Sequence, residues 1–165
     1  MVVVYEREFD WNEWFVIIGV VLLSLFVWVA PKIFSLLESI AFYLYGVFFG
    51  MFFDHTISVR PWDFYDVNDS SAYQLIDFLS YVMYGPYSYF FLYFYVKFRI
   101  KGFLNIPYVL AWTCISLLTG WIGVQIGLFH FEKGYNHYWS LPIYLFVQIL
   151  QIAFYHIIKN SKDST

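Results

Sequence analysis

Long apolar runs separated by short polar breaks dominate this chain, and they predict helices that cross a membrane. Each run can be read at about 17 to 25 residues, the length that spans a hydrocarbon core of roughly 30 Å. The five expected spans cover residues 14–30, 33–53, 73–96, 106–129 and 138–158. The predicted fold class is therefore an all-α polytopic transmembrane helical bundle, formed by residues 1–165 as a single integral membrane domain.

The composition leaves too little polar surface for a soluble domain of this size. Hydrophobic residues make up 61% of the chain and charged residues 13%, so the lipid bilayer is the partner that the sequence requires. Aromatic residues reach 26% and occur within the apolar runs as well as at their ends, which is more than an interfacial belt explains. A net charge of -3 without a long basic tract argues against nucleic acid as a partner. The single cysteine, Cys114, excludes an intramolecular disulfide.

Basic residues near the ends of the spans predict the orientation of the chain. If residues 97–101 are cytoplasmic, five spans place one group of cations inside and a smaller group outside, as the positive-inside rule requires. The inner group is Lys32, Lys97, Arg99, Lys101, Lys159 and Lys162, and the outer group is Arg7, Arg60 and Lys133. The N-terminus is then outside and the C-terminus inside. The loops at 54–71 and 130–137 face the same outer side.

Small residues at three-, four- and seven-residue spacings mark two helix faces where another backbone can approach closely. They are Ser35, Ser39, Gly46 and Gly50 in the second span, and Ser116, Gly120, Gly123 and Gly127 in the fourth. We interpret both sets as helix-packing faces. A face beyond those needed inside the bundle would serve a second copy of the chain or a membrane-protein partner.

Polar residues that could carry chemistry gather at the predicted outer rim. The candidates are Asp54, His55, Asp77, His130, Glu132 and His137. Three histidine ligands, His55, His130 and His137, with a water molecule would suit a divalent metal ion such as zinc, although no known ligand spacing is present. The alternative interpretation is that these histidines bond the backbone or lipid headgroups at the interface. Asp77, about one turn inside the membrane, should pair with His55 or His130.

Polar and helix-breaking residues also interrupt the interior of the spans. Gly85-Pro86 lies near the centre of the third span and should kink it. Gln125, Gln148 and Gln151 either form hydrogen bonds between helices or line a polar route, and the first use is the ordinary one. Glu38, near the inner end of the second span, either extends to the interface or joins such a route.

Two motifs carry a resemblance to known sequences. One is the Pro61-Trp62-Asp63-Phe64 loop, and the other is the hinge Gly134-Tyr135-Asn136-His137-Tyr138-Trp139-Ser140-Leu141 that opens the last span. From the first motif to the second, the chain resembles an uncharacterised family of short, aromatic-rich multi-pass membrane proteins of spore-forming Gram-positive bacteria. The resemblance implies a bacterial cytoplasmic membrane as the location. It supplies no catalytic residues, because that family has no established activity.

The sequence leaves three functional hypotheses open. The preferred one is a non-enzymatic small multi-pass membrane protein that acts as a sensor, an accessory subunit or a membrane-organising factor. The second is a small oligomeric transporter or channel, with Asp77, Glu38 and the glutamines along its route. The third is a metal-dependent membrane enzyme with its site at the outer rim. The chain has no nucleophile elbow, glycine-rich phosphate loop or Cys-x-x-Cys pair, which argues against a serine hydrolase, a nucleotide-driven pump or a thiol oxidoreductase.

Overall fold

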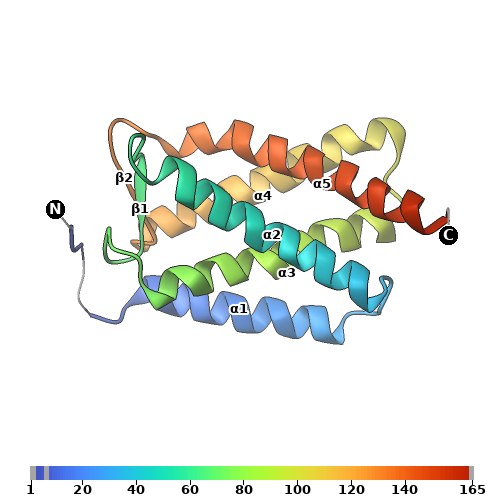
Figure 1. Cartoon of the computed structure of the whole chain (residues 1–165), viewed down its shortest axis with the longest axis horizontal. Helices are drawn as coiled ribbons and strands as arrows, with labels where there is room; N and C mark the ends of the chain where they lie inside the picture. The colour runs from blue at the N-terminus through green and yellow to red at the C-terminus, as the bar shows by residue number, and fades with distance from the viewer. Residues whose placement is uncertain (1–2, 6–7, 164–165) are drawn as a thin grey trace.

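The computed structural model describes residues 3–5 and 8–163, and these residues form five long helices in one bundle (Figure 1). The helices are α1 (Trp11–Val29), α2 (Leu36–Ile57), α3 (Leu75–Lys97), α4 (Asn105–Gln125) and α5 (Ser140–Asp163). Two short 3-10 helices, η1 (Gly102–Leu104) and η2 (His137–Trp139), lead into α4 and α5. Successive helices run in opposite directions, so the chain begins and ends at opposite ends of the bundle.

Two three-residue strands pair antiparallel at one end of the bundle, which we call the sheet end (Figure 1). Strand β1 (Tyr65–Val67) lies between α2 and α3, and β2 (Phe129–Phe131) lies between α4 and α5. The two loops that were expected to face the same side therefore share one end. The all-α expectation misses the strands, because three residues are too few for an alternating pattern to be recognised.

Within the described residues, four helical stretches are long and apolar enough to cross a membrane: α1, α2, Gly102–Gln125 and His137–Ser161. Helix α3 is as long as these but is not among them, since tyrosines and serines lower its hydropathy. It lies between the other helices (Figure 1) and holds much of the core, including Tyr81, Tyr89 and Leu92. A helix enclosed by helices needs no apolar surface toward lipid. By length and composition, four helical stretches of the described residues therefore qualify as membrane spans, whereas five spans were expected.

The outer helices expose large apolar side chains that a water-soluble protein would bury. Trp28 is 76% exposed and Leu37 is 80% exposed, and Phe26, Phe48 and Phe146 are exposed as well. So extensive an apolar surface is typical of a protein surrounded by lipid. The sides of the bundle therefore indicate a membrane protein.

Close packing of α2 on α3 depends on Gly46. A Cβ atom at this position would lie 2.1 Å from the carbonyl oxygen of Tyr84 and 2.6 Å from the Cβ of Ser88. Gly50, one turn later, lies against the ring of Tyr84. These glycines of the predicted stripe therefore serve contact between two helices of the same chain.

Gly85 and Pro86 form the seat of a tyrosine from α2. Pro86 has no N–H, so the carbonyl of Val82, four residues earlier, lacks its helical donor. The hydroxyl of Tyr43 donates to that carbonyl at 3.2 Å, and the Tyr43 ring lies where a side chain at Gly85 would be. The proline is thus accommodated within α3 by a neighbouring helix, which is the ordinary packed form of such a site.

Large aromatic side chains fill the space between helices that are not in close backbone contact. Between α3 and α4, Trp112 lies edge-on to Tyr87 at a centroid distance of 5.2 Å and to Phe91 at 5.7 Å. Between α2 and α5, Phe154 packs against Phe42 and Tyr45. These contacts explain why the chain is so rich in aromatic residues, since smaller side chains could not bridge these gaps.

Capping residues move several helix ends away from the expected positions. Asp10 accepts a hydrogen bond from the N–H of Asn12 at 3.1 Å, so α1 begins at Trp11 rather than at residue 14. Ser35, expected on a packing face, instead caps α2. Its backbone N–H donates a hydrogen bond to the carboxylate of Glu38. Gly127 has a φ of 80° and follows the end of α4. The fourth span therefore stops at Gln125, and Gly127 is a turn residue rather than a packing residue.

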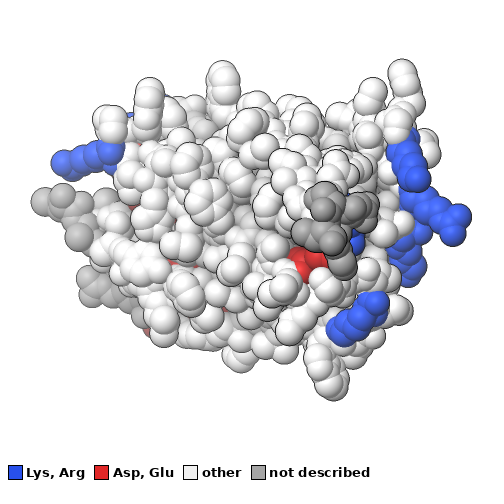
Figure 2. Space-filling view, turned by 45° about the vertical axis from the view of Figure 1, so that its right-hand side comes forward, with Lys and Arg blue, Asp and Glu red and all other residues white. Residues whose placement is uncertain are grey.

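Charges are separated between the two ends of the bundle. The end opposite the sheet, which we call the basic end, carries Lys32, Lys97, Arg99, Lys101 and Lys159, and Figure 2 shows most of the visible lysine and arginine side chains on its right-hand side. The sheet end carries Glu8, Asp10, Glu13, Asp54, Asp63, Asp66, Asp69, Asp77 and Glu132, with Arg60 and Lys133. Arg7 and the side chain of Lys162 lie outside the described residues. At the basic end, Lys159 pairs with the buried carboxylate of Glu38 at 2.6 Å.

Candidate functional site

Three segments that are distant in the sequence join at the sheet end to form a folded cap, consisting of residues 3–5, 65–71 and 128–132. The backbone of Tyr5 donates to the carbonyl of Asp69 at 2.8 Å, and that of Ser71 donates to Val3 at 3.0 Å. The backbone of Asn68 donates to Leu128 at 3.0 Å. The N-terminal segment is therefore held to the loop between α2 and α3, which is in turn held to the loop between α4 and α5.

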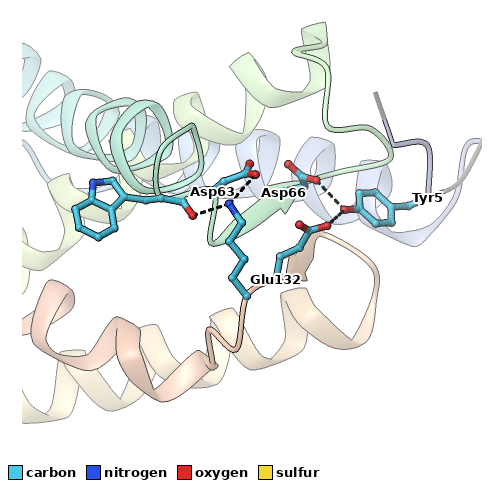
Figure 3. Close-up of polar contacts among 6 residues, drawn as sticks. Tyr5, Asp63, Asp66 and Glu132 are labelled. Carbon is cyan, nitrogen blue, oxygen red and sulfur yellow. Dashed lines mark hydrogen bonds and ion pairs between the residues drawn. The ribbon is translucent and has the colours of Figure 1, made fainter. Parts of the chain in front are cut away.

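Tyr5 lies at the centre of the polar side chains of the cap. Its hydroxyl is 2.7 Å from Oδ2 of Asp66 and 3.0 Å from Oε1 of Glu132 (Figure 3). Its ring stacks on the imidazole of His130 with a centroid distance of 3.8 Å and an angle of 2°. Asp66 is opposite His130 in the sheet, and Glu132 is two residues further, so all three side chains share one face. We call this group the Tyr5 clasp.

A single phenolic hydrogen serves two carboxylates in the clasp. A hydroxyl has one hydrogen to donate, so it is shared between Asp66 and Glu132 as a three-centre bond. Burial, together with these two acceptors, raises the pKa of Tyr5 above its usual value. A raised pKa means that the stability contributed by the hydroxyl is fully present below about pH 10, the unfolded value, and is lost only as the pH rises further. The donor is therefore present over the whole physiological range.

A second polar contact at the cap lies close to the solvent. Lys133 pairs with Asp63 at 3.0 Å and donates to the carbonyl of Trp62 at 3.0 Å (Figure 3). Both charged side chains are well exposed, so this pair contributes less than about 1 kcal/mol. It holds the two loops in register and leaves the Trp62 ring exposed on the surface of the cap.

Within the cap, Asn68 connects β1 to the start of α3. Its side chain is 0% exposed and donates from Nδ2 to Asp77 at 2.6 Å. The other carboxylate oxygen of Asp77 accepts from the N–H of Gln74 at 2.6 Å, which satisfies a free donor at the start of α3. The expected pairing of Asp77 with His55 or His130 is thus wrong. Asp77 is a buried helix-capping residue instead.

Asp54 and His55 occupy the last turn of α2, near the cap. Asp54 accepts hydrogen bonds from the hydroxyls of Tyr81 and Ser58. His55 is exposed, bonds the carbonyl of Met51 at 3.0 Å and lies against the rings of Tyr73 and Tyr81. The tyrosine that Asp54 binds is in α3, so this carboxylate links the ends of two helices.

His137 packs on α4 rather than joining the other histidines. Its Nε2 is 2.6 Å from the carbonyl of Leu117, which requires the tautomer with a hydrogen on Nε2. A Cβ at Gly120 would lie 2.6 Å from Cε1 of His137. Gly120, expected on a helix-packing face, therefore makes room for this ring. The other small residues of α4 have similar neighbours, since Gly123 faces Phe129, and Ser116 bonds Tyr87 at 2.8 Å.

The three histidines of the expected metal site do not come together. His55 contacts α3, His130 stacks on Tyr5, and His137 binds α4. In residues 3–5 and 8–163, no group of three or more His, Cys, Asp or Glu side chains is arranged to hold a metal ion. Each histidine has a backbone or ring partner instead.

The glutamines inside the bundle have close polar partners. Gln148 accepts from Thr113 at 3.0 Å and donates to Ser116 at 3.2 Å. Gln151 donates to both the carbonyl and the hydroxyl of Ser88 at 2.7 Å. Gln125 ends α4 and is exposed. The two buried glutamines therefore bind α5 to α3 and α4, which is the ordinary use of such residues.

Sequence reasoning did not find the residues that organise the cap, namely Tyr5, Asp66 and Asn68. One signal was present for Tyr5, since Val2-Val3-Val4-Tyr5 is a run of residues that favour strands. No signal was present for Asp66 or Asn68, because their partners are set by the pairing of β1 with β2 and by the position of α3.

Comparison of the chain with models of known protein families, with curated proteins and with solved structures finds no match.

Proposed function

We propose that the chain is a non-enzymatic multi-pass protein of a bacterial cytoplasmic membrane, acting as a sensor or accessory subunit through its cap. In this proposal five helices anchor the protein, and the cap faces the outside. The observation that carries it is the Tyr5 clasp, in which one hydroxyl joins the N-terminal segment to two separate loops. Short loops would be enough to connect the helices. The clasp therefore supports a cap whose surface has a defined shape.

The charge distribution supports the orientation. Cations collect at the basic end and carboxylates at the sheet end, and cytoplasmic loops of membrane proteins carry the excess of Lys and Arg. The cap then presents carboxylates and the exposed ring of Trp62 on the outer face. An aromatic residue within a charged rim is typical of surfaces that bind another protein.

The polar residues in the interior of the bundle favour an anchoring role for the helices and argue against a route for solutes. Gln148, Gln151 and Asp77 are engaged by neighbouring side chains or backbone groups, and Tyr43 packs on Gly85 at the expected kink of α3. Their hydrogen bonds stabilise contacts between helices.

One observation favours a small oligomeric transporter or channel as the second candidate. Asp54 accepts a hydrogen bond from the hydroxyl of Tyr81, and Tyr84 and Tyr87 follow Tyr81 along α3. This part of α3 runs from the sheet end toward the middle of the bundle (Figure 1). Solute flux into proteoliposomes that is abolished by Asp54→Asn and retained by Asp63→Asn would establish this function in place of the first.

Site-specific photo-crosslinking in the native membrane tests the proposed function. A benzophenone amino acid at Trp62, on the cap, should capture one defined protein partner or a second copy of the chain. The same probe at Trp121 is the matched control, because this tryptophan is similarly exposed but lies on the side of α4. It should react with lipid.

Loss of the clasp should abolish the cross-link at the cap. Tyr5→Phe removes the hydroxyl but keeps the ring that stacks on His130, so the fold of the bundle should be unchanged. We expect the partner band at Trp62 to fall at least fivefold in this variant, since a hydrogen bond to a charged acceptor contributes roughly 1.5 to 3 kcal/mol. A monomeric protein that cross-links only to lipid at both positions would rule the proposed function out.

A further inference from the structure

An apolar groove runs between α4 and α5 on the half of the bundle nearest the basic end. Its walls are Ile106, Val109 and Leu110 from α4 and Leu145, Ile149 and Ile152 from α5, and its volume is about 280 Å³. Cavities of ~150 Å³ with apolar walls already hold small hydrocarbon molecules. In a membrane, this groove is large enough for part of an acyl chain.

The head of the groove is polar. Asn105, the first residue of α4, also lines it. Among the described residues, the buried Oδ1 of this side chain has no hydrogen-bond partner. Buried acceptors rarely lack a donor. If the Asn105 side chain turns toward the groove, a ligand that supplies a hydrogen-bond donor at this end would satisfy it.

Two cations precede the head of the groove in the chain, at positions six and four residues before Asn105. Lys101 precedes η1, whose three residues advance by roughly 6 Å before α4 begins at Asn105. Arg99 belongs to the same turn, which is fixed by backbone hydrogen bonds from Arg99 to Val96 and from Leu104 to Lys101. Both side chains are exposed. The turn therefore presents positive charge from an ordered backbone.

The other cations at the basic end have partners of their own. Lys32 donates to the last carbonyls of α1, Lys97 lies over the rings of Tyr93 and Phe94, and Lys159 pairs with Glu38. In the part of the chain that the structure describes, no hydrogen bond or ion pair engages the side chains of Arg99 and Lys101. They are free to bind an anion from outside the protein.

Exposed aromatic rings flank this pair of cations. Phe103 is 88% exposed and Phe98 is 60% exposed. Aromatic rings of this kind lie at the level of the lipid headgroups, where a phosphate would meet Arg99 and Lys101. The groove, its polar head and the cations thus follow one another in the order of a lipid's acyl chain, glycerol region and phosphate.

We propose that this surface binds one phospholipid with an anionic, hydroxyl-bearing headgroup, of the phosphatidylglycerol type. One acyl chain occupies the groove between α4 and α5, and the phosphate binds Arg99 and Lys101. The headgroup hydroxyls are the donors that Asn105 lacks. The proposal rests on the membrane location alone, so it stands or falls separately from the sensor or accessory role.

Native mass spectrometry of the full chain tests this binding. Protein is released by mild detergent from nanodiscs that contain equal amounts of phosphatidylglycerol and phosphatidylcholine with identical acyl chains. We expect one phosphatidylglycerol to remain on each wild-type chain. Arg99→Gln with Lys101→Gln should lower that bound fraction at least tenfold, since each cation near an anionic lipid strengthens binding severalfold. Arg60→Gln with Lys133→Gln removes two cations from the sheet end and should leave it unchanged.

The groove is tested by filling it. Ile149→Trp should displace the acyl chain and lower the bound fraction at least tenfold, whereas Ile157→Trp, at an equally exposed position of α5 outside the groove, should not. An unchanged thermal unfolding midpoint verifies the fold of each variant. Equal retention of both lipids, no retained lipid on the wild type, or no difference between these variants and their controls would overturn the proposal.

Discussion

Gly46→Ala is expected to destabilise the protein by about 3 kcal/mol or more, because the new methyl group has no room between α2 and α3. Its Cβ would lie 2.1 Å from a backbone oxygen of α3. A backbone atom cannot rotate away as a side chain can, so the two helices must separate. Their separation would also loosen Tyr43 from its seat on Gly85. The higher helix propensity of alanine offsets at most about 1 kcal/mol of this loss.

Gly19→Ala is the matched control for this prediction. The nearest atom to a Cβ at Gly19 is the sulfur of Met83, at 2.7 Å, and a methionine side chain can adopt another rotamer. We expect a change within about 1 kcal/mol of zero. The measurement is unfolding of both variants by denaturing detergent in mixed micelles. Equal stability of Gly46→Ala and Gly19→Ala would show that α2 and α3 do not pack as described.

Asp77→Ala should cost about 3 kcal/mol by removing a buried acceptor at the junction of the cap and α3. Loss of a helix cap contributes about 1 kcal/mol, and leaving the amide of the fully buried Asn68 without its acceptor contributes roughly 1 to 3 kcal/mol. The sheet end should respond first, since Asn68 ties β1 to α3. Hydrogen exchange of residues 65–71 is expected to accelerate more than that of the middle of α3.

Two variants serve as controls for this structural role. Asp63→Ala removes a carboxylate of the exposed pair with Lys133 and should cost less than about 1 kcal/mol. Asp77→Asn keeps one acceptor oxygen in place and should lose less stability than Asp77→Ala. A stable, fully folded Asp77→Ala protein would contradict the assignment of Asp77 as a capping residue.

The length of the apolar runs predicted the helices because each helix is a continuous local segment. The small residues of α2 and α4 were also visible as stripes, but the pattern does not tell which neighbour each one faces. Gly46 and Gly50 face α3, Gly120 faces a histidine of the following loop, and Gly127 ends a helix. Small residues at the same spacing therefore have three different roles, namely close helix packing, making room for a side chain, and forming a turn.

The cap could not be predicted to the same extent, because its geometry depends on contacts between distant segments. The sequence placed Glu132 and His130 at the correct end of the bundle. Their joint approach to Tyr5 follows from the register of β1 with β2, and a shift by one residue would turn both side chains to the other face. The prediction that the three histidines form a cluster was wrong for the same reason, because side chains at the same end of the bundle need not belong to one site.

The orientation of the cap and the crossing of the membrane by α3 form the central claim, and cysteine accessibility measures both at once. In a Cys114→Ala background, single cysteines replace Trp62 in the cap or Lys101 in the turn between α3 and α4, both at exposed positions. A membrane-impermeant maleimide is added to intact cells and to permeabilised cells. We predict labelling of Trp62→Cys in intact cells and labelling of Lys101→Cys only after permeabilisation. Labelling of both from the same side would mean that α3 does not cross the membrane, and labelling in the reverse order would place the cap inside, so either result would contradict the account.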